Sequence, residues 1–142
     1  ELDLLLFDLA PGTDRVEPLR AWVPGLSGAV VVTVASELAR FVVGKSLRRL
    51  AELGVPCLGV VENMAAYVCP HCGGEGPLFG PDAAFAGVPA LGRVPFDPAC
   101  TAEADAGRPP VLARPDAPVG RALRGVAAAL RARLEPGAGG TP

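Results

Sequence analysis

Two cysteines, Cys69 and Cys72, have the spacing most suggestive of chemistry in this chain; they lie in a stretch rich in proline and glycine. This spacing can direct both sulfurs and several backbone N–H groups at one centre, as in zinc knuckles and iron–sulfur ligand loops. A thioredoxin-like redox pair and an incidental turn are alternatives, but the Gly73-Gly74 that follows does not favour the helix that a redox motif opens. The pair therefore predicts metal ligation.

A complete metal site needs four ligands, and no second Cys-x-x-Cys or histidine pair follows at zinc-ribbon spacing. Two routes remain open. Cys57, Cys100 or His71 could complete the site within one chain, or two chains could each give two thiolates across a two-fold axis. Cys57 lies in an apolar run and Cys100 at the start of a predicted helix, positions typical of small buried side chains. Both are therefore weak candidates for metal ligands.

A second group of residues suits a nucleotide site. Asp8 follows the apolar run Leu4–Phe7, and an acidic residue at the carboxyl end of a buried parallel strand lies where such sheets bind ligands. Asp8 would hold Mg²⁺ through water, and Gly12 would sense a terminal phosphate. Asn63 follows another predicted strand directly and could read a base edge. Turns or caps at these three positions are the alternative interpretation.

The stretch Val43-Gly44-Lys45-Ser46 resembles the end of a phosphate-binding loop but lacks its context. The P-loop pattern requires a glycine at position 39, and this position is alanine. Lys45 also falls within the strongest helical pattern of the chain. We therefore predict that Lys45 belongs to a helix and does not bind phosphate.

These residues must be positioned by short apolar runs that alternate with helix-length segments, a pattern typical of an α/β fold with a mostly parallel sheet and helices on both faces. Between Glu62 and Pro89 the pattern gives way to Gly, Pro and Cys, which predicts a long functional connection, with a metal-binding loop over 62–80. The predicted strands are Leu2–Phe7, Ala29–Val34, Cys57–Val61 and Ala90–Val94, and the predicted helices are Glu37–Leu53 and Ala117–Leu134.

Composition and charge narrow the class of protein further. The chain has 142 residues, 50% of them hydrophobic, and a formal net charge of -2, which predicts one soluble domain over residues 1–134 and a disordered tail over 135–142. Thirteen basic residues are offset by fifteen acidic ones, so we expect no nucleic-acid partner and no membrane partner. No apolar stretch approaches the ~20 residues that span a bilayer. A Cys-x-x-Cys pair without a secretion signal predicts a cytoplasmic protein.

Together these pieces resemble the Mrp/ApbC family, which includes the Nbp35-like and Ind1-like iron–sulfur carrier ATPases within the MinD/ParA group of deviant P-loop NTPases. The likeness covers residues 2–134 but only the carboxyl-terminal half of a family member. The order of the motifs carries the resemblance. Leu5–Thr13 is similar to the family's switch II stretch, and Val31–Val34 with Glu37 and Lys45 is similar to its next strand and helix. Gly59–Met64 followed by Cys69–Gly73 is similar to its most specific signature, Gly92–Pro98 to its Gly-x-x-Pro-Leu-Asp-Pro block, and Pro115–Pro118 to its carboxyl end.

The resemblance implies a homodimer that holds a [4Fe–4S] cluster between paired Cys69 and Cys72 and delivers it to apo iron–sulfur proteins under the control of ATP. Asp8 and Gly12 would then face Mg²⁺ and the γ-phosphate, with Asp8 in the catalytic role, and Asn63 would face the adenine. The Walker A loop that the family places upstream is absent from these residues, so the resemblance supports cluster binding by this chain better than ATP hydrolysis. The alternative is a non-enzymatic module that binds zinc or a cluster and carries a vestigial nucleotide site.

Overall fold

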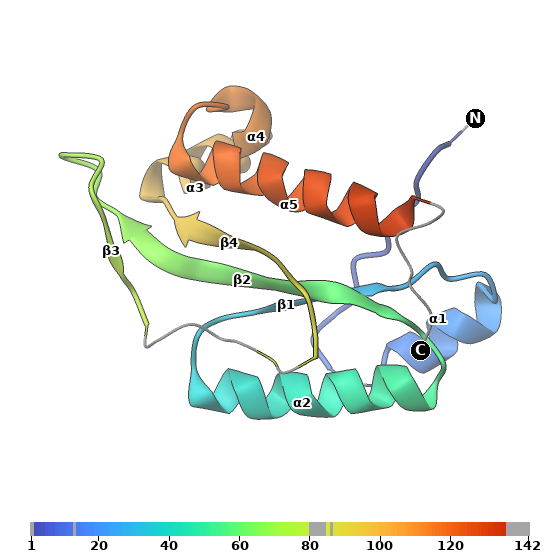
Figure 1. Cartoon of the computed structure of the whole chain (residues 1–142). Helices are drawn as coiled ribbons and strands as arrows, with labels where there is room; N and C mark the ends of the chain where they lie inside the picture. Colours follow the sequence, from blue (N-terminus) through green and yellow to red (C-terminus); the bar gives the residue numbers. More distant parts are fainter. Residues whose placement is uncertain (1, 13, 80–84, 86, 136–142) are drawn as a thin grey trace.

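The computed structural model describes residues 2–12, 14–79, 85 and 87–135, and its core is a four-stranded sheet built around one long strand. Figure 1 shows this strand, β2, crossing the whole molecule. In chain order the elements are α1 (Val16–Trp22), β1 (Ala29–Thr33), α2 (Glu37–Glu52), β2 (Cys57–Val68), β3 (Glu75–Pro77), β4 (Ala90–Phe96), α3 (Pro98–Asp105), α4 (Pro110–Ala113) and α5 (Pro118–Leu134).

Strand β2 pairs along both of its edges. It is parallel to β1 from Cys57 to Glu62 and parallel to β4 from Val60 to Tyr67. Strand β3 pairs antiparallel with the last residues of β2, from Ala66 to Val68. Because β4 occupies one edge of β2 throughout this region, β1 and β3 must share the other edge, one after the other. Most of the pairing is parallel, which confirms the predicted α/β class.

The two long helices cover opposite faces of the sheet, as Figure 1 shows for α2 and α5. Helix α2 begins where the Ser36 hydroxyl accepts a hydrogen bond from the Ala39 N–H, at 3.1 Å, and it ends before Gly54, whose φ of 65° suits a glycine. Helix α5 approaches β4 closely because Gly92 has no side chain: a Cβ there would lie 2.7 Å from Val126 Cγ2. Both helices begin and end within two residues of the bounds that the sequence predicts.

The hydrophobic core lies between the sheet and α5. Val61 from β2 and Val94 from β4 pack with Cys100 from α3 and Val119 from α5, and all four side chains are buried. Burial of this kind stabilises the fold by roughly 25 cal/mol for each Å² of apolar surface removed from water. No helix among the described residues is long and apolar enough to cross a membrane.

Two predictions about the strands are wrong. The run Leu2–Phe7 forms no strand: its residues are exposed and have no ladder partner among the described segments, and a strand exists only through such a ladder. Strand β2 does not end at Val61 but continues to Val68, because β4 and β3 pair with residues that look irregular in sequence. Helix α1 was not predicted. Residues 136–142 of the predicted disordered tail lie outside the described residues.

Candidate functional site

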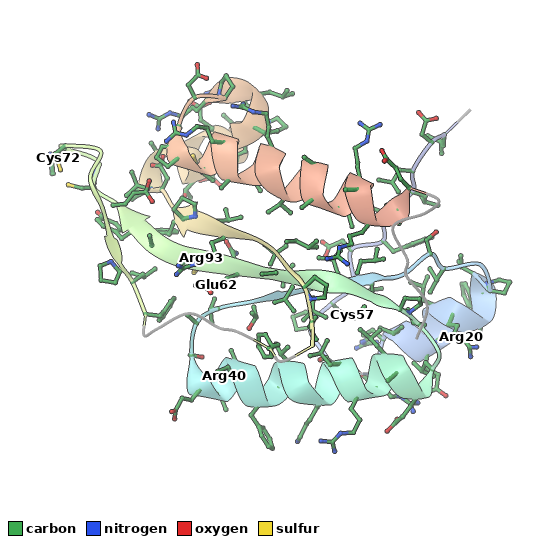
Figure 2. The ribbon with its side chains drawn as sticks, viewed as in Figure 1. Arg20, Arg40, Cys57, Glu62, Cys72 and Arg93 are labelled. Carbon is green, nitrogen blue, oxygen red and sulfur yellow. The ribbon has the colours of Figure 1, made fainter. Side chains whose placement is uncertain are left out.

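Cys69 and Cys72 lie in the tight turn that joins β2 to β3. The Cys69 N–H donates to the Gly74 carbonyl at 2.9 Å, and the Gly73 N–H donates to the Cys69 carbonyl at 2.8 Å. Gly73 adopts a φ of 70°, which a residue with a side chain rarely takes. Figure 2 shows Cys72 at the tip of this hairpin, far from the helices. The turn therefore presents both thiols together at the end of a projecting arm.

The environment of the Cys69 sulfur favours the thiolate. The backbone N–H of Cys72, the backbone N–H of His71 and the Cys72 thiol all direct hydrogen bonds at it, and together they lower the pKa of Cys69 below its ordinary value. A thiolate is the form of cysteine that binds metal. Cys72 is exposed and Cys69 is half-buried, so both sulfurs are accessible from outside.

The other two cysteines cannot reach this turn. Cys57 begins β2, and eleven residues at about 3.3 Å each separate it from Val68 at the far end of the same strand. Cys100 is buried in the core, where desolvation first and the neighbouring Asp97 next raise its pKa. Burial also raises the pKa of Cys57, which is half-buried. The structure thus argues against both as ligands that complete the site.

No third acidic, cysteine or histidine side chain joins the two thiols within the described part of the chain: no group of three such residues there could hold a metal ion. His71 lies in the turn but is exposed. Two thiols alone leave half of a tetrahedral coordination sphere open. Within the described residues, neither Cys57 nor Cys100 therefore completes a four-ligand site at this turn.

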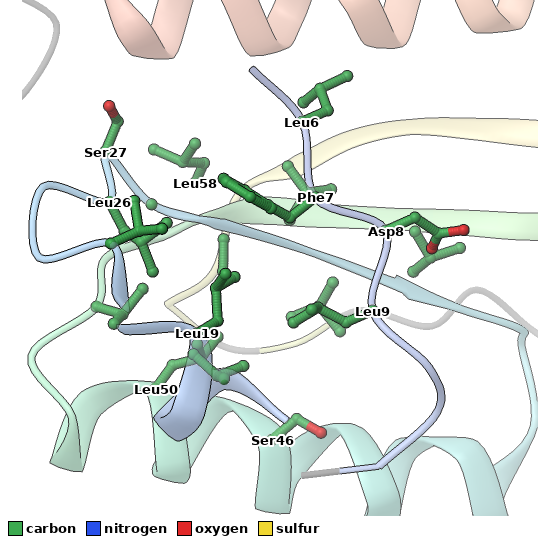
Figure 3. A pocket seen from close by; sticks show the side chains of 18 of the residues that line it. Leu6, Phe7, Asp8, Leu9, Leu19, Leu26, Ser27, Ser46, Leu50 and Leu58 are labelled. Carbon is green, nitrogen blue, oxygen red and sulfur yellow. The ribbon is translucent and has the colours of Figure 1, made fainter. Parts of the chain in front are cut away.

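Asp8 and Gly12 line a hollow of about 910 Å³ between residues 3–12, α1, β1 and α2. Figure 3 shows Asp8 beside this hollow, with its carboxylate on the opposite side of the segment from the Phe7 and Leu9 side chains. Gly12 has a φ of 138°, a backbone conformation that residues with a side chain rarely adopt, so this position favours glycine. Because Leu2–Phe7 is not a strand, no strand of the sheet carries Asp8.

Asn63 is not part of the same hollow. It lies in β2 opposite Val94, one residue beyond the point where β1 ends, and its side-chain oxygen accepts the Met64 N–H at 2.9 Å. Met64 has a φ of 52°, so Asn63 supports a local turn in the strand. Asp8, Gly12 and Asn63 are therefore spread over two regions. Lys45 lies within α2 with its ammonium 4.5 Å from the Phe41 ring centroid, which confirms that it is a helix residue.

Sequence reasoning missed an ion pair in the centre of the sheet. The buried Glu62 of β2 accepts a hydrogen bond from Arg93 of β4 at 3.0 Å, and the two residues are direct neighbours across the strands. Figure 2 shows them together in the middle of the sheet. Thr33 of β1, also buried, flanks Glu62 on the other side. Only the register of the three strands brings these residues together, so no local motif could have indicated the pair.

The fold and the turn define an α/β domain that presents two thiols on a projecting hairpin. The model of the ParA family, described as NUBPL iron-transfer P-loop NTPase, matches residues 1–131. The chain belongs to this family, and the resemblance in the motif order is confirmed.

Curated relatives of the chain support the same family. The iron-sulfur cluster carrier protein of Saccharolobus solfataricus is 39% identical over 133 residues, which cover 89% of this chain and 45% of that protein. The protein of the same name from Aquifex aeolicus is 38% identical, over 94% of this chain and 38% of its own length. The cytosolic Fe-S cluster assembly factor NBP35 of Eremothecium gossypii is 37% identical, over 92% and 42%. The chain thus spans less than half the length of these relatives.

Proposed function

We propose that this chain is the cluster-holding part of an iron–sulfur cluster carrier, in which Cys69 and Cys72 from each of two copies bind one bridging [4Fe–4S] cluster as cargo for apo iron–sulfur proteins. The observation that carries the proposal is the turn itself: two accessible thiols, one of lowered pKa, with no third ligand among the described residues. Family membership and the names of the relatives support iron–sulfur cargo over other metals.

The pairing of two copies follows from ligand arithmetic. A [4Fe–4S] cluster takes four thiolates, and one chain offers two at this turn. A two-fold axis through the turn would bring the same two residues from the second copy and complete the set. The projecting hairpin suits this contact because the tips can meet while the bodies of the two domains stay apart.

In the same proposal, ATP binding and hydrolysis require polypeptide beyond these residues. Asp8 would hold Mg²⁺ through water, Gly12 would lie near the γ-phosphate, and Asn63 would read the adenine. Phosphoryl transfer depends on a phosphate-binding loop with its lysine, and Lys45 does not serve as one. A cytoplasmic location is part of this proposal.

Anaerobic reconstitution with iron and sulfide tests the cargo. We expect about two iron and two sulfide ions per chain, with charge-transfer absorption in the visible range. Cys69→Ala and Cys72→Ala should abolish retention of iron, whereas the matched control Cys57→Ala should retain it. Full retention of iron by Cys72→Ala would contradict the proposal.

A second candidate is a zinc- or cluster-binding module whose nucleotide site is vestigial. One observation favours it: Asp8 lies on an exposed segment that pairs with no strand in the described part of the chain. Metal analysis after purification without added iron separates the zinc-binding form of this module from a cluster carrier. One zinc per chain or per pair of chains, with no uptake of iron and sulfide, would favour the module.

A further inference from the structure

Strand β2 contains a break between the body of the sheet and the thiol turn. Its ladder with β4 shifts register after Asn63 and resumes at Tyr67. Between these points residues 64–66 of β2 stand against Pro95 alone, which has no N–H to donate across the ladder. Extra residues on one strand of a ladder bend that strand and increase its twist. The break therefore sets the direction in which β2 continues toward the thiol turn.

Met64 adopts the backbone conformation that makes this break. Its φ of 52° lies in the left-handed region, and Met64 is the one residue other than glycine with a positive φ in the part of the chain that the structure describes. A side chain makes this conformation unfavourable, so it persists where neighbouring groups support it. Asn63 gives that support, because its side-chain oxygen accepts the Met64 N–H at 2.9 Å.

The hairpin that follows the break carries its own hydrogen bonds. Residues 66–68 pair with β3, and the Cys69 N–H donates to the Gly74 carbonyl at 2.9 Å. The hairpin can therefore keep its shape whichever way it points. Figure 1 shows it projecting beyond the ends of β1 and β4. A change of backbone conformation at Met64 would thus redirect both thiols together.

The stack of the Tyr67 and Phe96 rings also ties the base of the hairpin to β4, at 6.4 Å between ring centroids and 27° between ring planes. Stacked rings interact over a range of offsets and separations, so this contact allows the hairpin to tilt. The φ of Met64 is more restrictive, because the left-handed region open to a residue with a side chain is small. The bond from Asn63 therefore determines the direction of the hairpin more closely than the ring stack does.

We infer that Asn63 is a positioning residue for the cluster site: through its bond to the Met64 N–H, it holds the break in β2 that directs Cys69 and Cys72 toward a second copy. The inference rests on the proposed function, in which two thiols of each copy meet at one cluster. Ligands of such a site must be held within about 0.5 Å of the productive geometry, so a rotation of either hairpin weakens binding. This role operates without nucleotide and is separate from the adenine contact proposed above.

The test compares variants of the full 142-residue chain, all without nucleotide. Asn63→Ala removes the acceptor of the Met64 N–H, and Asn63→Asp keeps an oxygen in the same place. Met64→Gly added to Asn63→Ala supplies a residue that adopts the left-handed φ without support. Ser36→Ala is the matched control, because the Ser36 hydroxyl also accepts a backbone N–H, from Ala39 at 3.1 Å, but at the start of α2 and outside the hairpin.

Release of the reconstituted cluster to a ferrous chelator gives the first measurement, followed anaerobically by the loss of visible absorption. We expect Asn63→Ala to release iron about tenfold faster than the parent chain, from the loss of one supporting hydrogen bond, and Asn63→Asp and the double variant to return to within about twofold of the parent. Ser36→Ala should release iron at the parent rate, although its free energy of unfolding falls. Parent-like release by Asn63→Ala, or equal acceleration by Ser36→Ala, would overturn the inference.

Residual dipolar couplings of the apo chain test the positioning without a cluster. Couplings of the amides at 66–68, Glu75 and Gly76, compared with those of α5, report the direction of the hairpin. Asn63→Ala should change or average them, and Asn63→Asp should restore them; unchanged couplings in Asn63→Ala would overturn the inference. Failure of the parent chain to take up iron and sulfide would instead contradict the proposed function.

Hydrogen exchange of the unsubstituted chain keeps the test decisive if Asn63→Ala folds poorly. The Met64 amide should exchange slowly, because the Asn63 oxygen accepts its hydrogen. A Met64 amide that exchanges as fast as an unstructured one would overturn the inference.

Discussion

Cysteine occurs at four positions of this chain, and its surroundings give each position a different character. At the hairpin tip, backbone N–H groups stabilise the Cys69 thiolate and lower its pKa. In the core, burial raises the pKa of Cys100 and keeps it a neutral thiol. Burial raises the pKa of Cys57 as well. Hydrogen-bond donors and burial therefore decide how readily each cysteine forms the thiolate, which is the form that binds metal.

We expect Cys69 of the apo chain to react with iodoacetamide at lower pH than Cys57, because only the thiolate is the nucleophile. The pH profile of alkylation, followed by mass spectrometry of each cysteine, measures this. Cys72→Ala should move the Cys69 profile part of the way to ordinary values, since the residue-72 N–H remains but the thiol donor is lost. Cys72→Ser, which retains a donor, should shift it less. Identical profiles for Cys69 and Cys57 would contradict the assignment.

The raised pKa of Cys100 predicts that the folded chain loses stability at alkaline pH. Its pKa is raised in the folded state, so the folded chain holds the proton more tightly than the unfolded chain. The free energy of unfolding is therefore unaffected below the ordinary thiol pKa of about 8.5 and falls as the pH rises above it. Urea unfolding at a series of pH values measures the slope. Cys100→Ala should lower stability at neutral pH but flatten this alkaline decline; an unchanged decline would assign it to other groups.

At the scale of elements, β2 connects the body of the domain to the thiol turn. Its first half pairs with β1 and its last residues pair with β3 and β4, so one strand extends from the core to the hairpin. The Tyr67 and Phe96 rings stack at a centroid distance of 6.4 Å near the base of the turn. The register of β2 against its neighbours thus determines where the thiols lie.

The Glu62–Arg93 pair is expected to stabilise that register. Arg93→Gln should lower the free energy of unfolding by about 1–3 kcal/mol, because it leaves the buried Glu62 carboxylate without its guanidinium partner. The double variant Glu62→Gln with Arg93→Gln should recover part of this loss, since no buried charge remains. Urea unfolding of the two single variants and the double variant measures the coupling. Equal losses in Arg93→Gln and the double variant would show that the pair has no special role.

At the scale of the whole molecule, the proposed cluster couples two copies of the chain. Cluster binding should tighten the dimer, and dilution should release the cluster, by mass action. Sedimentation of apo and reconstituted protein over a range of concentrations measures both. Cys69→Ser should remove cluster and dimer together. A monomer that retains a full metal centre would refute the bridging arrangement and favour a site closed within one chain.

We also expect the 142-residue chain alone to show no meaningful ATP hydrolysis, because Lys45 belongs to α2 and no lysine-bearing phosphate loop is present in the sequence. Release of phosphate from ATP with Mg²⁺ measures this, with heat-treated protein as the control. Turnover that Asp8→Ala removes and Lys45→Ala leaves intact would contradict the expectation.

The α/β class, both long helices and strands β1 and β4 could be predicted from sequence, because each depends on the spacing of apolar residues within a few turns of chain. The thiol pair could be found for the same reason: its chemistry lies in a spacing of two residues. These features are local, so the sequence alone determined them.

Features that depend on neighbouring strands required the tertiary structure. Leu2–Phe7 has the composition of a strand but pairs with no strand among the residues that the structure describes. Residues 62–68 have an irregular composition but acquire partners in β3 and β4. The Glu62–Arg93 pair and the separation of Cys57 from the thiol turn follow from the same pairing. A strand is stabilised by hydrogen bonds to another segment of chain, so its existence and length are decided between segments and not within one.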